Sequence, residues 1–249
     1  MKKFIISAFF LLSAFMAMSQ QQFVVNGVIE YERHINVHRQ FETDDDDGGF
    51  WKDFLSKQPK FYNSYFNLSF NKEQSVYKPG REGDKDMEPW LIGPAKKNIV
   101  YTNFNSLEYR SRRKVFEENF EIVDTLSKIK WRLTTETRTI AGFECRKAVG
   151  IICDSVYITA FYTDEIPVSG GPESFGGLPG MILGLAVPRL YSTWFATKVE
   201  LTDPPAASFE PVKAGKQKKM TAAAFAPFLK DTFTDWGARG AKNIWWSML

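Results

Sequence analysis

The chain has 249 residues, 44% of them hydrophobic and 15% aromatic, enough for one large domain or two small ones around a real core. This composition excludes a wholly disordered protein. The formal charge of +3 falls to +1 (3 − 2) once a leader carrying Lys2 and Lys3 is removed, which gives no reason to expect nucleic acid as a partner.

The first segment, residues 1–19, has the three parts of a secretory signal peptide: a basic start, an apolar stretch and a small-residue cleavage site. The alternative is a transmembrane anchor, which needs roughly 20 apolar residues, and the run here is shorter. There is no Cys near the cleavage site, and no later segment is apolar enough to span a membrane. We therefore expect an exported protein, periplasmic or secreted, that is not a lipoprotein.

Residues 23–37 are predicted to form the first strand, and an acidic run follows it. His34 and His38 precede the run, which contains Asp44 and Asp46. One interpretation is a divalent-cation site built from these imidazoles and carboxylates. The other is a solvated loop with two surface histidines, since the run lacks the ligand spacing of an EF-hand.

Periodicity and turn residues then predict a short helix, two strands and an exposed loop, at residues 50–55, 62–70, 74–77 and 78–97. The first of these strands alternates, with Phe66, Leu68 and Phe70 on one face.

A second hairpin is predicted at residues 98–104 and 107–116, followed by a strand at 120–123. Arg110, Arg112 and Lys114 share one face of the second hairpin strand, opposite Tyr109, Ser111, Arg113 and Val115. The basic face is either an anion-binding surface or a solvent-exposed one, and the latter is favoured.

The central part of the chain begins with a strand at 131–137. A hairpin follows, with strands at 140–153 and 156–163 around a short polar turn. Pro167 cannot donate to a β ladder, so regular pairing is expected to stop near it.

Residues 170–180 form a loop with five glycines and two prolines, too dense a mixture for a helix or a central strand. A structural interpretation is favoured, in which the glycines permit turns and Leu178 plugs the core. In the functional interpretation the loop binds a ligand or partner, because glycine lets another backbone approach closely. The candidate binding residues are Glu165, Pro167, Gly177, Leu178, Pro179 and Gly180.

This central stretch resembles the GLPGLI family, secreted or cell-envelope proteins of Bacteroidota. The matching segments are Trp131, ETRTIAGFECRKA (136–148), FYTDEIPVSGGP (161–172) and GGLPGMIL (176–183). The chain departs from the family pattern at Met181, where Leu is expected, and at Gly184, where a carboxylate is expected. The resemblance implies a compartment and a family but no established reaction.

Cys145 and Cys153 would lie roughly 26 Å apart on one continuous strand, at about 3.3 Å per residue. A disulfide requires Cα atoms within about 7 Å. Two unbonded cysteines are favoured, and a bond would require a turn near Gly150.

The last part of the chain is predicted to add two strands, a linker and a helix, at residues 181–187, 191–201, 203–219 and from Thr221 onwards. Thr221 is the candidate N-cap, Pro227 should kink or restart the helix, and Gly237 should end it. The apolar stripe of the helix is expected to pack on the sheet rather than on a membrane. Residues 244–246 form either a last strand or an exposed aromatic patch.

The sequence lacks the motifs of a catalytic triad, a phosphate-binding loop, a dinucleotide site and a zinc protease. No cofactor is expected. Two carboxylates near the Gly-Leu-Pro-Gly motif at 177–180, Glu165 and Glu173, leave open a carboxylate-dependent hydrolase.

The pattern of elements predicts a mainly β protein: an antiparallel, strongly curved sheet or open barrel with a helix near each end. The expected division is a signal peptide (1–19), a β domain (20–203), and a linker with a C-terminal helix (204–249). The favoured function is a non-enzymatic envelope protein that binds a hydrophobic ligand or another envelope protein. The alternatives are the hydrolase around Glu165 and the cation-binding protein.

Overall fold

The computed structural model describes residues 25–41, 49–84, 87, 89–152, 155–211 and 215–249. The predicted signal peptide, together with Asp44, Asp46 and Cys153, lies outside these residues. Within the described part of the chain, no helix is both long and apolar enough to cross a membrane.

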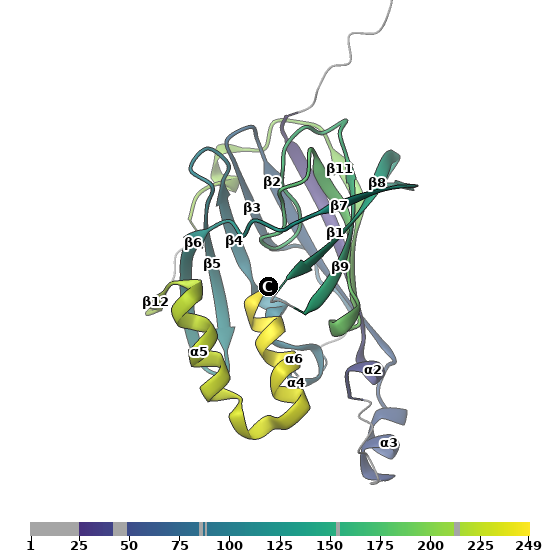
Figure 1. The fold of residues 1–249 in the computed structure, drawn as a ribbon, viewed down its shortest axis with the longest axis vertical. Coiled ribbons are helices and arrows are strands. Elements are labelled where there is room, and N and C mark those ends of the chain that lie inside the picture. Colours follow the sequence, from purple (N-terminus) through teal and green to yellow (C-terminus); the bar gives the residue numbers. More distant parts are fainter. Residues whose placement is uncertain (1–24, 42–48, 85–86, 88, 153–154, 212–214) are drawn as a thin grey trace, which may run out of the picture.

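One open, strongly curved sheet dominates the described residues, as the sequence predicts (Figure 1). Its twelve strands are β1 (Gly27–Asn36), β2 (Phe61–Phe70), β3 (Gln74–Pro79), β4 (Ile99–Asn103), β5 (Glu108–Val115), β6 (Glu118–Thr125), β7 (Arg132–Ile140), β8 (Phe143–Ile152), β9 (Val156–Thr163), β10 (Met181–Val187), β11 (Ser192–Glu200) and β12 (Lys218–Met220).

The strands follow the spatial order β12-β6-β5-β4-β3-β2-β1-β11-β10-β9-β8-β7. Nearly all neighbours are antiparallel and most are joined by short turns. The exception is β12, which pairs in parallel with β6 inside the segment predicted as a linker. Strands β12 and β7 are the two edges, so the sheet curls without closing.

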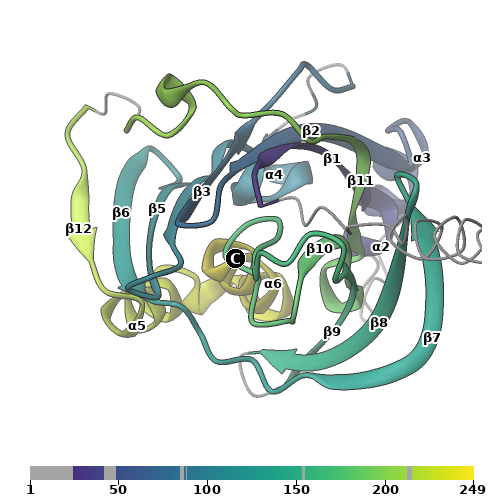
Figure 2. The ribbon, with the colours of Figure 1, turned by 90° about the horizontal axis from the view of Figure 1, so that it is seen from above.

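Helices lie near both ends of the described chain: α2 (Val37–Phe41), α3 (Gly49–Ser56), α5 (Ala222–Thr232) and α6 (Gly237–Met248), with the short α4 (Pro89–Ile92) between them. Seen from above, the sheet curls around α4 and α6 (Figure 2). The C-terminal helix therefore fills the hollow that the curved sheet leaves.

Alternation along the strands explains which face turns inward. In β1 every second residue is buried, beginning with Gly27, and in β2 Phe66, Leu68 and Phe70 are buried, which confirms their predicted shared face. Most strands bury one face in this way, whereas the edge strand β7 is exposed as far as Ile140, and the buried faces form a single apolar core.

The prediction of an exposed loop at 78–97 is confirmed for residues 81–84, which are exposed, and wrong for the second half of the segment. This segment contains α4 and a 3-10 helix, η1 (Pro94–Lys97), and Leu91, Ile92 and Ala95 are buried. Helical pieces of four residues are too short to show a helical period. The Pro and Gly content of the segment is then the strongest local signal, and it indicates a loop.

The predicted start of the strand at 140–153 was also wrong, because β8 begins only at Phe143. Ile140 ends β7, and Ala141 and Gly142 form a tight turn with φ of 49° and 88° before β8 begins. Positive φ at both positions is the geometry of a two-residue hairpin, which an Ala-Gly pair signals weakly. The hairpin between β8 and β9 is present as predicted.

At the C-terminal end, the Thr221 side chain accepts a hydrogen bond from the Ala224 amide at 3.2 Å, which confirms the predicted N-cap. Helix α5 ends at Thr232 rather than at Gly237, which instead begins α6 with φ of 53°. Residues 244–246 were predicted as a strand or an exposed patch, but they are helical and Trp246 is 1% exposed. The three adjacent bulky residues at 244–246 resemble the pattern of a strand, because so short an apolar run shows too little periodicity to indicate a helix.

Strand β8 runs without interruption past Cys145, which is a buried, free thiol.

Candidate functional site

The connection from β9 to β10, residues 164–180, which we call the signature loop, folds tightly against its own ends. The Met181 amide donates to the Ile166 carbonyl at 3.0 Å, and the Ile182 amide donates to the Gly170 carbonyl at 2.9 Å. From outside the loop, the Trp131 indole N–H donates to the Gly176 carbonyl at 3.0 Å. These bonds fix the loop on the sheet at both ends and in the middle.

Glycine is required here by close packing and by backbone conformation. A Cβ at Gly180 would lie 2.0 Å from the Thr163 carbonyl oxygen, and Gly177 has φ of 84°. Leu178, between them, is 2% exposed. This arrangement supports the structural interpretation of the loop, whereas Pro167, Gly177 and Pro179 remain exposed candidates for binding.

At Gly184, where the family pattern suggests a carboxylate, a Cβ would lie 2.8 Å from both the Ile140 Cδ1 and the Phe195 ring. The space that a side chain would need is filled by β7 and β11. An acid at this position would therefore require these neighbours to move.

The two glutamates beside the loop have opposite environments. Glu165 is exposed, whereas Glu173 is 2% exposed and has φ of 53°, an unusual conformation for a residue other than glycine. The loop therefore does not present these two carboxyl groups together to one substrate.

Glu173 belongs to a polar cluster that sequence reasoning missed, formed with Arg33, Arg113 and Asn98. The Asn98 amide donates to Glu173 Oε2 at 3.0 Å. Burial raises the pKa of Glu173 above its ordinary value, and Asn98 and the two guanidinium groups partly oppose that shift.

Arg33 lies on the inner face of β1 and is fully buried. Its Nε donates to Ser64 Oγ at 3.1 Å and its Nη1 to the Ala95 carbonyl of η1 at 3.0 Å. Its guanidinium also lies 5.4 Å from the Trp246 ring of α6. Burial lowers the pKa of Arg33.

Arg113 holds the other side of the cluster from β5. Its Nη1 donates to the Ser247 carbonyl in the last turn of α6, and its Nε donates to Ser111 Oγ. Carbonyls in the last turn of a helix lack intrahelical partners and favour a cation, so Arg113 caps α6 from inside the protein.

The cluster thus joins the sheet, η1, the signature loop and α6 through enclosed groups. A group that acts on a substrate must be able to touch it, and these charges are turned toward their own chain. A signal for two members was present in the sequence, since Arg33 and Arg113 each lie on the buried face of an alternating strand. No sequence pattern pointed to Asn98.

The candidate cation site is only partly within the described residues. His34 Nδ1 lies 2.6 Å from Asn63 Oδ1, and His38 Nε2 lies 2.9 Å from the Gln58 carbonyl. Among the described residues, no group of three or more His, Cys, Asp or Glu side chains is placed to hold a metal ion. Asp44 and Asp46 fall outside that region, so a site that includes them stays a prediction.

A small cavity adjoins the loop, lined by Ser75, Thr102 and residues 169–171 and 174–176 among others. Its volume is about 10 Å³, which is room for about one water molecule. This cavity is too small for an apolar ligand.

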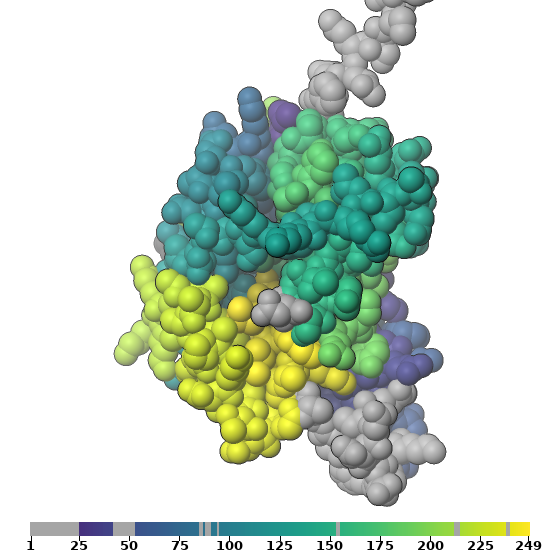
Figure 3. All heavy atoms as spheres, viewed as in Figure 1, coloured from purple at the N-terminus to yellow at the C-terminus, as the bar shows by residue number. Residues whose placement is uncertain are grey.

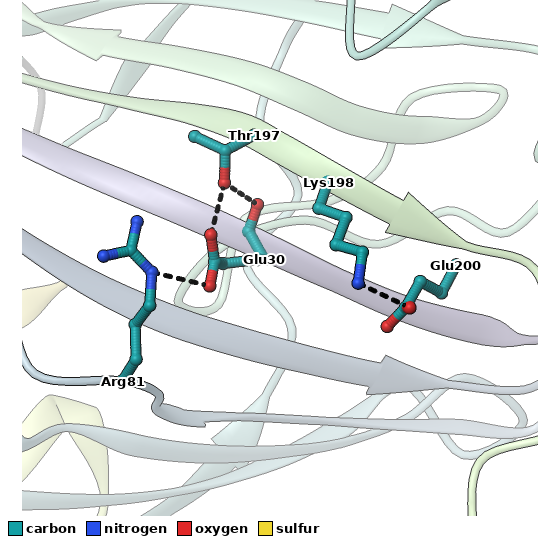
Figure 4. A network of polar contacts seen from close by, with 5 residues as sticks. All are labelled: Glu30, Arg81, Thr197, Lys198 and Glu200. Carbon is teal, nitrogen blue, oxygen red and sulfur yellow. Dashed lines mark hydrogen bonds and ion pairs between the residues drawn. The ribbon is translucent and has the colours of Figure 1, made fainter.

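The outer surface of the sheet carries a second polar network, on β1, β11 and the segment after β3 (Figure 4). Arg81 Nε donates to Glu30 Oε2 at 3.0 Å, and Thr197 Oγ1 donates to Glu30 Oε1 at 2.7 Å. Lys198 pairs with Glu200 at 2.6 Å. Exposed pairs of this kind contribute about 0–1 kcal/mol each, so the network is surface structure rather than a demanding binding site.

Fold and loop together define a β module in which a curved sheet encloses a C-terminal helix and a polar cluster. The family profile described as "N-glycanase peptide, N-terminal domain" matches residues 92–221, more than half of the chain. The chain therefore belongs to this family. The matched span begins at the end of α4, contains the signature loop and ends at the cap of α5.

Solved structures of PNGF-II resemble this fold. Those in the C2 and P21 space groups superpose with TM-scores of 0.51 and 0.50, each at 17% identity and over 86% of this chain. At this identity the likeness is one of fold. The match covers 33% and 34% of those chains, so this chain spans about a third of the length of PNGF-II. The comparison with curated proteins gave no match.

Proposed function

We propose that this protein is a recognition module for N-linked glycans or for the glycoproteins that carry them. The family match over residues 92–221 is the observation that carries this proposal, because the family is named for N-glycanases, whose substrates carry such glycans. The earlier expectation of an envelope-protein partner is compatible with it where that partner is glycosylated.

Recognition is proposed in preference to hydrolysis because the carboxylates of the signature loop do not converge. Glu165 is exposed, and Glu173 is enclosed with Asn98 and two arginines. Acid–base cleavage requires groups within reach of one bond. A glycan is proposed in preference to a hydrophobic ligand because the family is named for N-glycanases, and the cavity beside the loop, which holds about one water, gives no support for an enclosed apolar ligand.

Export and membership of the GLPGLI family belong to the same proposal. Both rest on sequence: the leader at residues 1–19 and the ordered motifs between residues 131 and 183. An exported module would meet glycans on surfaces and on secreted proteins.

The test is a binding measurement with the purified full chain. An immobilised glycoprotein with N-linked glycans is compared with the same polypeptide after enzymatic removal of its glycans. The expected result is binding to the first, competition by free N-glycan, and loss of binding to the second. Equal binding to both polypeptides, or to neither, would overturn the proposal. Mass spectrometry of the supernatant checks for released glycan, whose appearance would replace recognition with hydrolysis.

A further inference from the structure

Three aromatic rings meet at one end of the molecule and form what we call the aromatic platform: Phe116, Phe233 and Trp236. The ring centroids of Phe116 lie 5.4 Å from Phe233 and 5.6 Å from Trp236. Phe233 and Trp236 meet edge to face at 5.5 Å. Phe116 is 52% exposed and Trp236 is 44% exposed, whereas Phe233 is buried beneath them.

Two distant parts of the chain build this platform. Phe116 is in the turn between β5 and β6, and Trp236 ends the 3-10 helix η4 (Thr234–Trp236) between α5 and α6. The β5–β6 turn and the α5–α6 connection lie at the same end of the ribbon (Figure 1). In the space-filling view α5 and α6 form part of the surface at this end (Figure 3).

The conformation of Phe116 is unfavourable for its residue type. Its φ is 51°, in the left-handed region, where a side chain costs roughly 1–2 kcal/mol relative to the right-handed conformation. Two-residue hairpin turns ordinarily use Gly, Asn or Asp at such positions. The turn itself therefore does not favour Phe, and what distinguishes Phe116 from Leu107, which has φ of 56° and the same exposure, is its contact with two further aromatic rings.

Trp236 is held by its surroundings rather than by deep burial. The Trp236 amide donates to the Phe233 carbonyl at 3.1 Å, and Gly237 follows with φ of 53°, so the chain turns directly into α6. Phe233, which is 5% exposed, supports both exposed rings from below. A rigid pair of ring faces loses little conformational entropy on binding.

Charged residues adjoin Phe116 and Trp236 in the sequence. Lys114 pairs with Glu117, next to Phe116, at 3.1 Å, and both side chains are exposed. Asp235, next to Trp236, is also exposed. A pyranose ring has an apolar C–H face and a rim of hydroxyl groups. The electron-rich face of an aromatic ring suits the first, and charged donors and acceptors suit the second.

We propose that Phe116 and Trp236 form the glycan-binding surface of this protein, on which the C–H face of a pyranose unit stacks. This inference rests on the proposed function and assigns its contact residues. Phe116 lies within the span matched by the family, whereas Trp236 lies beyond it, so the complete platform uses a segment outside the matched domain.

The test applies the glycoprotein assay to Phe116→Ala and Trp236→Ala. Each is expected to weaken binding about three- to tenfold, as the loss of one aromatic contact does. Leu107→Ala is the matched control for Phe116, because Leu107 has φ of 56° and is also 52% exposed, but lies at the other end of β5. Tyr157→Ala controls for Trp236, because Tyr157 is an aromatic residue 64% exposed outside the platform. Both controls should bind within about twofold of the wild type.

Conservative variants separate stacking from simple apolar contact. Trp236→Tyr keeps a ring face and should retain binding, whereas Trp236→Leu keeps apolar area and should lose it. Thermal unfolding of every variant verifies that the fold is intact.

The outcomes distinguish the two proposals. Glycan-dependent binding by the wild type that is unchanged in Phe116→Ala and Trp236→Ala would overturn the platform and leave the recognition function standing. A wild type that does not distinguish the two polypeptides would overturn both. Variants that lose binding to the glycan-free polypeptide would assign the platform to protein contact and overturn the glycan assignment.

Discussion

The polar cluster around Glu173 and the aromatic platform each depart from the usual distribution of residues. The cluster buries charged side chains, and the platform exposes aromatic ones. Charged side chains are ordinarily exposed, yet Arg33, Arg113 and Glu173 are enclosed. Large aromatic side chains are ordinarily covered, yet Phe116 and Trp236 are about half exposed.

The two regions differ in what surrounds the unusual groups. The enclosed charged groups bond to Asn98, to Ser64 and to the backbone of α6 and η1, so these partners belong to the same chain. The exposed rings rest on Phe233 from one side only. We infer that the cluster maintains the fold and that the platform is available to bind.

The largest effect is expected from Glu173→Ala, which removes a buried carboxyl group that accepts from the Asn98 amide at 3.0 Å and lies in the field of Arg33 and Arg113. Leaving the buried Asn98 amide without its acceptor costs about 3 kcal/mol, the upper part of the usual range, and urea unfolding would measure the loss. Glu165→Ala, at an exposed position in the same segment, should change the free energy of unfolding by less than about 0.5 kcal/mol. Equal effects of the two substitutions would show that the cluster is not what fixes the loop.

The pH dependence of this cluster has a defined sign. Burial raises the pKa of Glu173 in the folded state above the ordinary value of 4.5, so the folded protein holds this proton more tightly than the unfolded chain. The resulting stabilisation is complete below about pH 4.5 and is lost as the pH rises through the raised pKa. The wild type should therefore lose stability relative to Glu173→Gln over that interval. A difference independent of pH would place the carboxyl group in water.

The interior should also be chemically unreactive at Cys145, the buried thiol of β8. Burial raises the pKa of Cys145 to about 12, whereas a free thiol has a pKa near 8.5. Since the thiolate is the reactive form, alkylation at about pH 8 should be about a thousandfold slower than in denaturant. Peptide mapping after timed iodoacetamide labelling would measure this. Fast labelling of the native protein would mean that β8 opens.

The signature loop should tolerate added bulk only where it is not packed. Gly180→Ala places a Cβ against the Thr163 carbonyl and should cost about 3 kcal/mol, the upper part of the usual range for overpacking. Gly177→Ala meets nothing closer than 3.6 Å, so only its φ of 84° opposes it, and the expected loss is about 1–2 kcal/mol. Chemical denaturation of both variants tests whether packing, rather than conformation, explains the loop. A larger loss at Gly177 would reverse that explanation.

Much of the sheet could be predicted because alternation is a local signal. Phe66, Leu68 and Phe70 repeat at every second position, and Thr221 precedes a helix at a fixed offset. The residues of α4 and α6 could not be assigned in this way. Helix α4 has only four residues and shows no period, and α6 begins with two glycines in four residues, which are typical of a loop. The burial of both depends on a hollow that forms only when the sheet curls.

The candidate sites were harder to predict because contacts between distant residues create them. Arg33 and Arg113 could have been suspected, since each lies on an apolar strand face. Their meeting with Glu173 depends on how the signature loop folds back over the sheet. Similarly, nothing near Phe116 in the sequence indicates that Trp236 will lie against it.

The smallest expected effect concerns the control position Leu107, which shares the backbone conformation of Phe116 but has no ring partner. Leu107→Gly should raise the free energy of unfolding by about 0.5–1 kcal/mol, because relief of the left-handed conformation (about 1–2 kcal/mol) exceeds the entropic cost of glycine (about 0.5–1 kcal/mol). Phe116→Gly gains the same relief but loses its contacts with Phe233 and Trp236, so its stability should stay near that of the wild type. The difference between the two variants in thermal unfolding measures how firmly the platform is packed. If Phe116→Gly were stabilised as much as Leu107→Gly, the rings would contribute nothing to one another, and the rigid surface proposed for a sugar would not exist.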